Sequence, residues 1–376
     1  MVLRLACAAL ALAAAHGLTS PRLARQAPRM QFEAGVTVSA ERVAVVGASG
    51  YIGRNVVREC VRRGFATTAV VRSEARLTAE TRAPLEGAAV VDAECGDQAA
   101  IEGLFKKEKI DVVICCLASR SGTESDSMAV DYQASVNALE AARAAGARHF
   151  VLLSALCVRK PTLAFQKAKL KTEAALAAQT DVTYSVVRPT AFFKSLSGQV
   201  EILKGGGPFV YFDLGGGRSA KCNPISEADL AAAIVDCVCD PSRNSASGDP
   251  IWNLGGPESG ISMEAQGELI ADALAETSGS ERKAPWLLPV PISLFDVIIG
   301  GIDAVAKLTG SAKIADAAEL GRIGKYYAVE DMLTTNPSEQ YGKTKLLEHY
   351  KRIAVEGQEY DPYTTMFAPA TKNLAK

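Results

Sequence analysis

Short apolar runs alternate with amphipathic stretches between residues 42 and 189. The runs lie in RVAVVGASG, ATTAVVR, AAVVDAEC, DVVICCLAS, RHFVLLSA and VTYSVVRPT, and each is rich in β-branched residues and too short for a helix. Between them, apolar residues recur at helical spacing, as Ile52, Val56 and Cys60 do. Buried strands separated by helices form a parallel sheet that is covered on both faces. We therefore expect a doubly wound α/β fold.

The first apolar run leads directly into a glycine motif. Gly47, Gly50 and Gly53 follow the pattern G-x-x-G-x-x-G between the first expected strand and the first expected helix. Glycines permit the tight turn and the close approach of a pyrophosphate, whose charge the N–H groups of the helix start attract. In this strand–turn–helix setting, the motif predicts a Rossmann domain that binds a dinucleotide.

Two positions bear on which dinucleotide binds and how. Arg72 follows the second strand, where an NAD-binding domain carries an acidic residue on the ribose hydroxyls. An arginine attracts the 2′-phosphate of NADPH instead, and Arg76 is placed to help. The alternative is an ordinary solvated arginine. Asp97, after the third strand, is expected either at the adenine edge or as a helix N-cap. We predict NADPH as the cofactor.

The fourth and fifth strands add candidates on the nicotinamide side of the crevice. The fourth strand runs to Leu117 and Ala118, and the fifth ends at Ser154, where a catalytic or orienting serine is expected. Lys169, in the next helix, is placed to reach the nicotinamide ribose, and Glu173 is expected to pair with it or to face solvent. The predicted cofactor-binding residues are Gly47, Ser49, Gly50, Tyr51, Ile52, Gly53, Arg72, Asp97, Leu117, Ala118 and Lys169.

The alternation loosens after Pro189, and this change suggests a domain organisation. Glycine and proline become denser, as in KGGGPF and GDPIWNLGGPESG. We expect a Rossmann domain over residues 41–190 and a smaller C-terminal α/β lobe that binds substrate over 191–360. Residues 361–376 are expected to form a flexible tail. The apolar run 287–308 is interrupted by Asp296, Asp303, proline and glycine, which favours a core-facing or surface-seeking helix over a membrane span.

The N-terminal segment has the composition of a targeting sequence. Its basic residues are Arg4, Arg22, Arg25 and Arg29, and the first carboxylate is Glu33. An apolar Ala/Leu run precedes a basic stretch without acidic residues, as in a signal segment followed by a transit segment. We expect residues 1–35 to be a cleaved bipartite presequence for a plastid; a plain secretory or mitochondrial presequence is the alternative.

Composition excludes several classes of function. The formal net charge of −1 gives no general attraction to nucleic acid. The nine cysteines form no C-x-x-C pair and only three histidines are present, so we expect buried free thiols and no protein metal site.

The helix with Lys169 departs from a known pattern at one position. GASGYIG, a serine after strand five, Lys169 and VVRPT together resemble the short-chain dehydrogenase/reductase superfamily, in its atypical or extended branch. That resemblance implies a catalytic tyrosine four residues before the lysine. Phe165 stands there and has no proton to give. The chain is therefore either not an enzyme or an enzyme for a substrate that needs no hydroxyl acid at this place.

Longer blocks narrow the resemblance. CCLASRSGTESDSMAVDYQASVNALEAARAAGARHFVLLSALCVRKPTLAFQKAKLKTEAAL, YSVVRPTAFFKSLSGQVE, NPISEADLA and AELGRIGKYYAVEDML are similar to the NADPH-dependent divinyl (proto)chlorophyllide a 8-vinyl reductases. The similarity spans roughly residues 42–350. It implies a plastid enzyme that reduces the 8-vinyl group of a chlorophyll precursor to ethyl, with peripheral thylakoid or envelope association as a possibility.

That chemistry suits a phenylalanine. A vinyl group forms no alkoxide on reduction, and charge on its inner carbon is dispersed through the tetrapyrrole, but a proton must still be delivered. We expect Lys169 to orient the cofactor, with Lys167, Cys157 or water as the proton source and Lys167 or water preferred. Ser154 completes the predicted catalytic set.

The substrate that the resemblance implies is flat and apolar and carries a propionate. The residues expected to contact it are Phe165, Arg188, Phe192, Phe193 and Lys194, with Lys221 as a further cation. Arg188 at a strand end is equally suited to a structural role, and paired phenylalanines commonly fill a core.

Two other functions remain open from the sequence. One is a non-catalytic NADP(H) sensor or assembly scaffold, which the missing tyrosine favours. The other is an enone reductase of the isoflavone-reductase type, which would need a small aromatic pocket. The oligomeric state is not predicted.

Overall fold

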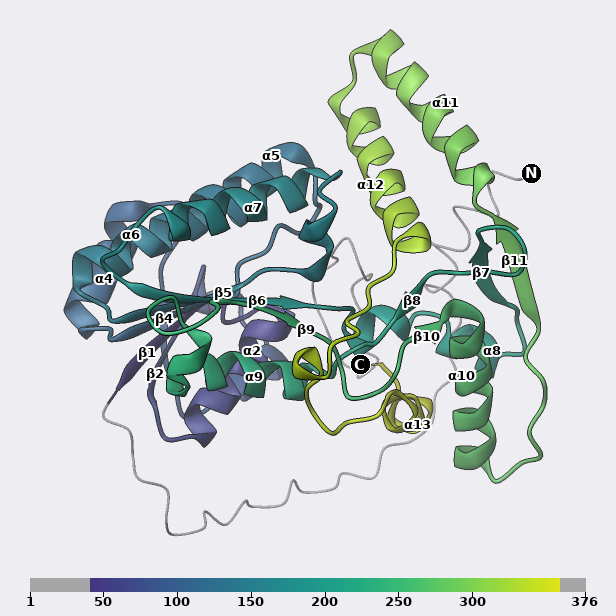
Figure 1. Ribbon diagram of the computed structural model, residues 1–376, viewed down its shortest axis with the longest axis horizontal. Coiled ribbons are helices and arrows are strands. Elements are labelled where there is room, and N and C mark those ends of the chain that lie inside the picture. Colours follow the sequence, from purple (N-terminus) through teal and green to yellow (C-terminus); the bar gives the residue numbers. More distant parts are fainter. Residues whose placement is uncertain (1–40, 359–376) are drawn as a thin grey trace.

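A seven-stranded parallel sheet forms the centre of the computed structural model, which describes residues 41–358 (Figure 1). The strand order is β3-β2-β1-β4-β5-β6-β9, and it confirms the expected doubly wound α/β fold. The order reverses direction between β1 and β4, which is where doubly wound folds bind nucleotides. The strands are β1 (Arg42–Val46), β2 (Ala66–Val71), β3 (Ala89–Asp92), β4 (Val112–Cys115), β5 (His149–Leu153), β6 (Thr183–Pro189) and β9 (Ile251–Leu254).

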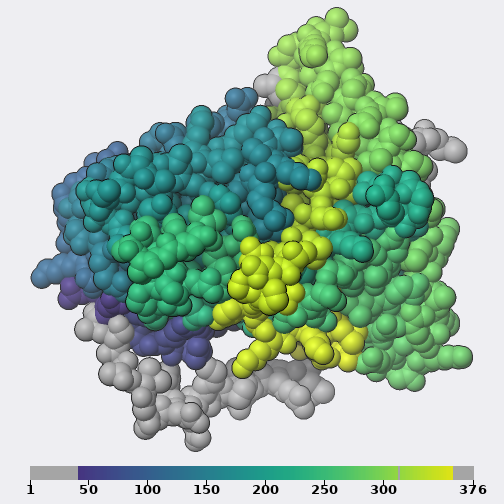
Figure 2. All heavy atoms as spheres, in the orientation of Figure 1, coloured from purple at the N-terminus to yellow at the C-terminus, as the bar shows by residue number. Residues whose placement is uncertain are grey.

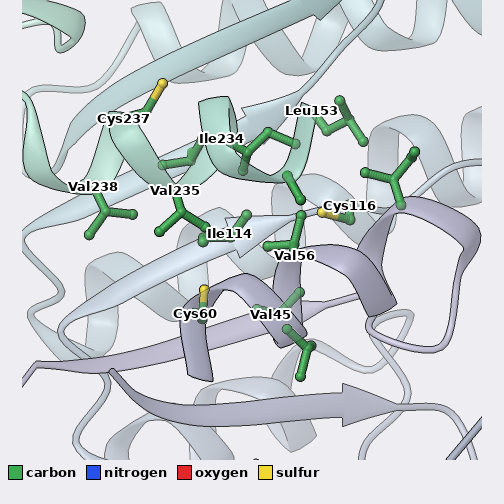
Figure 3. Close-up of a cluster of buried hydrophobic side chains, with 14 of the residues drawn as sticks. Val45, Val56, Cys60, Ile114, Cys116, Leu153, Ile234, Val235, Cys237 and Val238 are labelled. Atoms are coloured by element: carbon green, nitrogen blue, oxygen red, sulfur yellow. The ribbon is translucent and has the colours of Figure 1, made fainter. Parts of the chain in front are cut away.

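Helices cover both faces of this sheet (Figure 1). One face packs on α2 (Tyr51–Arg62) and α9 (Glu227–Cys239); the other packs on α4 (Gln98–Glu108), α6 (Ser135–Ala145) and α7 (Ala164–Ala177). Figure 3 shows the first of these layers, where Val56 and Cys60 of α2 and Ile234 of α9 meet strand residues such as Val45. Because β1, β2, β4 and β5 are apolar on both faces, the two helix layers bury nearly all of the side chains on these four strands.

The domain boundary expected at residue 190 does not separate the sheet domain from the smaller lobe. β9 pairs in parallel with β6, and α9 packs against α2 on the Rossmann sheet. The chain therefore enters the smaller lobe after β6 and then returns to the sheet domain to form α9 and β9. Ser226 is the N-cap of α9, since its Oγ accepts from the N–H of Asp229 at 3.1 Å.

The remaining elements build the smaller lobe. Its core joins Phe193, Phe209, Ile270 and Tyr350. Two small sheets stabilise it, one of β7 with β11 and one of β8 with β10. The elements are β7 (Phe209–Asp213), β8 (Lys221–Cys222), β10 (Ile261–Ser262), β11 (Leu287–Pro291), α8 (Val200–Lys204), α10 (Met263–Ser278) and α13 (Leu346–Glu356). Figure 2 shows the last described part of the chain, in yellow, along the junction between the sheet domain and this lobe.

A helical hairpin projects from the lobe (Figure 1). It consists of α11 (Ser293–Thr309) and α12 (Ala312–Val329), and α11 exposes Val297 and Leu308. The apolar run 287–308 is thus a short strand, β11, followed by a surface helix. Over the described range 41–358, no helix combines the length and the hydropathy that crossing a membrane requires. The expected presequence, 1–35, and tail, 361–376, lie outside the described residues.

Candidate functional site

The glycine motif forms a cradle that a side chain would fill. Gly47 has φ +77°, and a Cβ atom there would lie 2.9 Å from the carbonyl oxygen of Cys116. A Cβ atom on Gly53 would lie 2.1 Å from the carbonyl oxygen of Gly47. Gly50 is the N-cap of α2 and offers no side chain to the N–H groups of the first turn. The positive end of α2 and these N–H groups therefore suit a pyrophosphate.

Other predicted cofactor contacts lie around this cradle. Leu117 lies two residues after the end of β4, and its N–H nitrogen would be 3.2 Å from a Cβ atom on Gly47. Leu117 is half-buried, Ala118 is exposed, and Ser49 and Tyr51 are half-buried. Ile52, in contrast, is buried in the core beneath α2. Its side chain therefore supports the cradle from below.

Arg72, which was predicted to meet a 2′-phosphate, is exposed immediately after β2. The nearest carboxylate in the sequence, that of Glu74, forms an ion pair with Arg82 at 2.7 Å. Arg76 is also exposed, in a short 3-10 turn. Asp97 is the N-cap of α4 and accepts from the N–H of Ala100 at 3.1 Å, which is the second of its two expected roles.

Lys169 lies in the interior and forms an ion pair with Asp131. Its Nζ atom is 3.1 Å from Oδ1 of Asp131, and 9% and 1% of the two side chains are exposed. Burial lowers the pKa of Lys169, but the charge and hydrogen bond of Asp131 outweigh burial and leave this pKa above its ordinary value. Lys169 therefore stays a cation at the carboxyl end of the sheet, where it also approaches the carbonyl of Leu153.

No sequence pattern marks Asp131 as the partner of Lys169. Asp131 lies in a π-helical stretch, Ser127–Ala134, inside what periodicity predicts as one long helix. Its other carboxylate oxygen accepts from the N–H of Ser119 at 3.2 Å, and its carbonyl accepts from Thr172 Oγ1 at 2.7 Å. Asp131 thus ties the loop after β4 to the helix of Lys169. A π-turn of this kind is frequent at functional sites and has no simple sequence signal.

Glu173 pairs with Arg188, so the expected pairing of Glu173 with Lys169 or solvent is wrong. Arg188 donates from Nε to Glu173 at 3.1 Å and forms an ion pair with it through the guanidinium. Ser154 Oγ donates to the same carboxylate at 2.5 Å. All three side chains are buried or nearly so, and the network joins the ends of β5 and β6 to α7. Arg188 therefore has the structural role that its position at a strand end left open.

Position 165 and position 167 lie on different faces of α7. Phe165 is 3% exposed and packs in an apolar cluster with Leu156, Ile323 and Tyr326. Lys167 is exposed. Side chains two residues apart on a helix point about 200° away from each other, so Lys167 points away from the face of Lys169. The prediction that Lys167 delivers the proton is therefore wrong, because the helix directs it to solvent.

The predicted substrate residues of the AFF segment divide between the site and the core. Phe193 is 1% exposed and lies within the core of the lobe, which makes it a packing residue. Phe192 is half-buried against the sheet domain. Lys194 places Nζ 4.3 Å from the ring centroid of Tyr51 at the start of α2. Lys194 therefore reaches from the lobe to the glycine cradle, while Lys221 is exposed.

The hydrogen bonds and ion pairs given above for Lys169, Asp131 and Glu173 involve no cysteine or histidine. The eight described cysteines are free thiols, and all except Cys239 are buried. His149 is buried on β5 between Thr183 and Ser185. Among residues 41–358, no three His, Cys, Asp or Glu side chains gather as a metal site requires.

Comparison with known proteins identifies the ligand class of this site. A family model described as NAD(P)H-binding matches residues 47–241. A solved NADPH-dependent quinone oxidoreductase of Escherichia coli has a TM-score of 0.57 and is 19% identical, and the match covers 83% of this chain and 99% of that one. This structural likeness supports the fold alone. Together with the glycine cradle, the family model establishes a nicotinamide dinucleotide as the cofactor.

Two curated plant proteins are similar to nearly the whole chain. The chloroplastic divinyl chlorophyllide a 8-vinyl-reductase of Arabidopsis thaliana is 44% identical over 336 residues, a match that covers 84% of this chain and 77% of that protein. The Zea mays protein of the same name is 43% identical over 334 residues, which cover 84% of this chain and 80% of the maize protein. Identity at this level over most of both chains reflects common descent, and this chain belongs to the divinyl chlorophyllide a 8-vinyl-reductase family of oxidoreductases.

Proposed function

We propose that this protein reduces the 8-vinyl group of divinyl chlorophyllide a, or of the related protochlorophyllide, to an ethyl group with NADPH. The observation that carries the proposal is a buried lysine beside the end of β5, Lys169, with no hydroxyl one helical turn before it. Similarity to the plant reductases along most of the chain supports the same activity.

The geometry suits reduction of a carbon–carbon double bond. When bound, the reduced nicotinamide supplies a hydride. Lys169, held by Asp131, is placed to bind the ribose hydroxyls and so to fix the cofactor's orientation. A ketone would gain a full negative charge on oxygen and need an acid beside it. A vinyl group conjugated with a tetrapyrrole disperses its charge, so the phenyl ring at position 165 is tolerated there.

The preference for NADPH rests on Arg72. Its guanidinium is exposed directly after β2, and the carboxylate of Glu74 faces Arg82. A 2′-phosphate beside β2 would therefore meet a cation. A candidate partner for the substrate's propionate is Lys194, whose ammonium lies over Tyr51 beside the cradle.

Plastid location follows from the same similarity, since the curated relatives are named chloroplastic. We propose that residues 1–35 direct the protein there as a signal segment followed by a transit segment. Peripheral contact with thylakoid or envelope membranes fits the apolar side chains that α11 exposes, Val297 and Leu308 among them.

The test is an incubation of protein lacking residues 1–35 with divinyl chlorophyllide a and either NADPH or NADH. Loss of vinyl conjugation shifts the Soret band to the blue, and the proposal expects this shift with NADPH and a much slower one with NADH. Tight NADPH binding without any shift would contradict the proposal and favour the sensor or scaffold function. A matched reaction with protochlorophyllide gives the substrate preference.

A further inference from the structure

Helix α12 is fixed against the helix that carries Phe165 and Lys169. Glu319 of α12 accepts from the N–H of Ala164, at the start of α7, at 3.2 Å. A carboxylate at a helix N-terminus is favourable because it satisfies a free N–H group and meets the positive end of the helix. At the other end of α12, Glu330 forms an ion pair with Lys160. These two contacts leave α12 little freedom to slide along α7.

This anchoring brings two neighbouring tyrosines to the loop after β5. Tyr326 donates its hydroxyl to the carbonyl of Cys157 at 2.9 Å, and the Tyr327 hydroxyl lies 3.5 Å from Cys157 Sγ. Their ring centroids are 5.5 Å apart at an interplanar angle of 78°. Tyr326 is buried in the cluster around Phe165, whereas Tyr327 is half-buried at the edge of that cluster. Two phenol groups thus stand close to the position that lacks one.

Lys169 belongs to the same neighbourhood. Burial raises the pKa of the Cys157 thiol, and the hydrogen bond with Tyr327 and the positive charge of Lys169 both oppose the rise. Burial also raises the pKa of Tyr327 well above its ordinary value. Both groups therefore keep their protons at neutral pH. The Tyr327 hydroxyl is therefore a protonated acid beside Cys157, in the loop after β5.

We propose that the hydroxyl of Tyr327 delivers the proton to the inner carbon of the substrate's vinyl group. The proposal rests on the proposed function and supplies the acid that Phe165 cannot. Hydride adds to the terminal vinyl carbon, the C=C π bond breaks, and the electron pair passes to the inner carbon. The O–H bond of Tyr327 then breaks as the inner C–H bond forms. Solvent returns a proton to the phenolate once the product leaves.

Tyr327 suits this role better than its neighbour. The Tyr326 hydroxyl is buried and donates to a backbone carbonyl, a strong acceptor that holds the proton in place. One hydrogen-bond partner of Tyr327 is the Cys157 thiol, and sulfur is a weaker acceptor than a backbone carbonyl. Tyr327 is also the more exposed of the two.

The experiment compares Tyr327→Phe with Tyr326→Phe, which removes a hydroxyl one residue away. Single-turnover vinyl reduction by Tyr327→Phe is expected to slow by about a hundredfold or more, the range for loss of a general acid. NADPH affinity and the melting temperature should stay as in the wild type. Tyr326→Phe is expected to keep its rate within about threefold, since it breaks one neutral hydrogen bond.

Isotope effects separate a proton donor from a packing residue. In Tyr327→Phe, protonation becomes the slow step, so the solvent isotope effect should grow and the isotope effect from 4-deuterated NADPH should shrink. Replacement of a tyrosine that only shapes the pocket would leave both isotope effects unchanged. An inactive wild type would contradict the proposed function. If the wild type is active and Tyr327→Phe is equally active, the role of Tyr327 is overturned while the proposed function stands. The same holds if Tyr326→Phe loses as much activity as Tyr327→Phe.

Discussion

The ammonium of Lys169 lies 3.1 Å from the carboxylate of Asp131, and both side chains are buried. Each charge loses its water on folding, so each depends on the other for compensation. Asp131 also accepts from the N–H of Ser119 after β4. The pair therefore links the crevice loop, a π-helical stretch and α7, and it holds the lysine in the place where a nicotinamide ribose is expected.

Asp131→Asn should unfold more easily than the wild type and bind NADPH more weakly. The substitution keeps the shape but leaves Lys169 as an uncompensated buried charge, which costs about 3–5 kcal/mol. Urea unfolding followed by circular dichroism measures the loss. Glu102→Gln, which removes an exposed ion pair with Lys106 on α4, is the control and should change stability by less than about 1 kcal/mol. Equal effects of the two substitutions would contradict this account.

Gly53→Ala should abolish dinucleotide binding. Its Cβ atom would lie 2.1 Å from the carbonyl oxygen of Gly47, so the cradle would have to open. Gly103→Ala in α4 is the matched control, because a Cβ atom there meets no atom within 4 Å. That control should gain about 0.8–1 kcal/mol of stability from helix propensity and bind normally. Fluorescence titration with NADPH distinguishes the two; normal binding by Gly53→Ala would refute the cradle.

Arg72→Ala should lose its preference for NADPH. A hydrogen bond to a charged group contributes about 1.5–3 kcal/mol, so kcat/KM for NADPH is expected to fall about tenfold to a hundredfold. The value for NADH should hardly change, since NADH has no 2′-phosphate. Arg58→Ala, which removes an exposed arginine from α2, is the control. A parallel fall with both cofactors would show that Arg72 does not read the 2′-phosphate.

Stability should fall in mild acid because of His349. Burial, with a smaller effect of Arg352, lowers the pKa of His349 to about 4. The unfolded chain takes up a proton near pH 6.5 and the folded chain only near pH 4, so this stability is present above pH 6.5 and is lost as the pH falls toward 4. Between pH 7 and pH 5 the expected loss is about 2 kcal/mol.

Replacement of His349 checks that assignment. The Nε2 atom of His349 is hydrogen-bonded to Ser197 Oγ at 2.7 Å. In His349→Gln the new side chain can keep a polar contact with Ser197 but cannot titrate. Urea unfolding of this variant between pH 7 and pH 5 should show a shallower pH dependence than that of the wild type. His149, whose pKa burial also lowers to about 4, supplies the remaining slope. An unchanged slope in His349→Gln would contradict the prediction.

Local patterns predicted most of the sheet but not the contacts between distant segments that complete the site. β1 to β6 and their helices follow from apolar runs and helical spacing, and the runs of β1, β2, β4 and β5 are buried on both faces. β9 lies among the residues expected to form the second lobe, yet it pairs with β6, since a four-residue strand after a long excursion has no local mark of its partner.

Long-range pairing explains the misses within the site. Lys169 was located by its spacing from strand five, whereas its partner Asp131 lies on a separate helix and could be recognised only once that helix was placed. The contact of α12 with α7 depends on the orientation of the whole hairpin, which no periodicity encodes. Helical geometry already placed Lys167 opposite Lys169, so the face of α7 was the one signal in the sequence that would have excluded it.

The position of isotope in the product tests the central claim most directly. Protein lacking residues 1–35 is given divinyl chlorophyllide a and NADPH deuterated at nicotinamide C4, and the ethyl group is analysed by NMR and mass spectrometry. We predict one deuterium on the terminal carbon with labelled cofactor in ordinary water. In heavy water with unlabelled cofactor, the deuterium should appear on the inner carbon. Deuterium from the cofactor on the inner carbon, or none in the ethyl group, would contradict hydride transfer to the vinyl terminus.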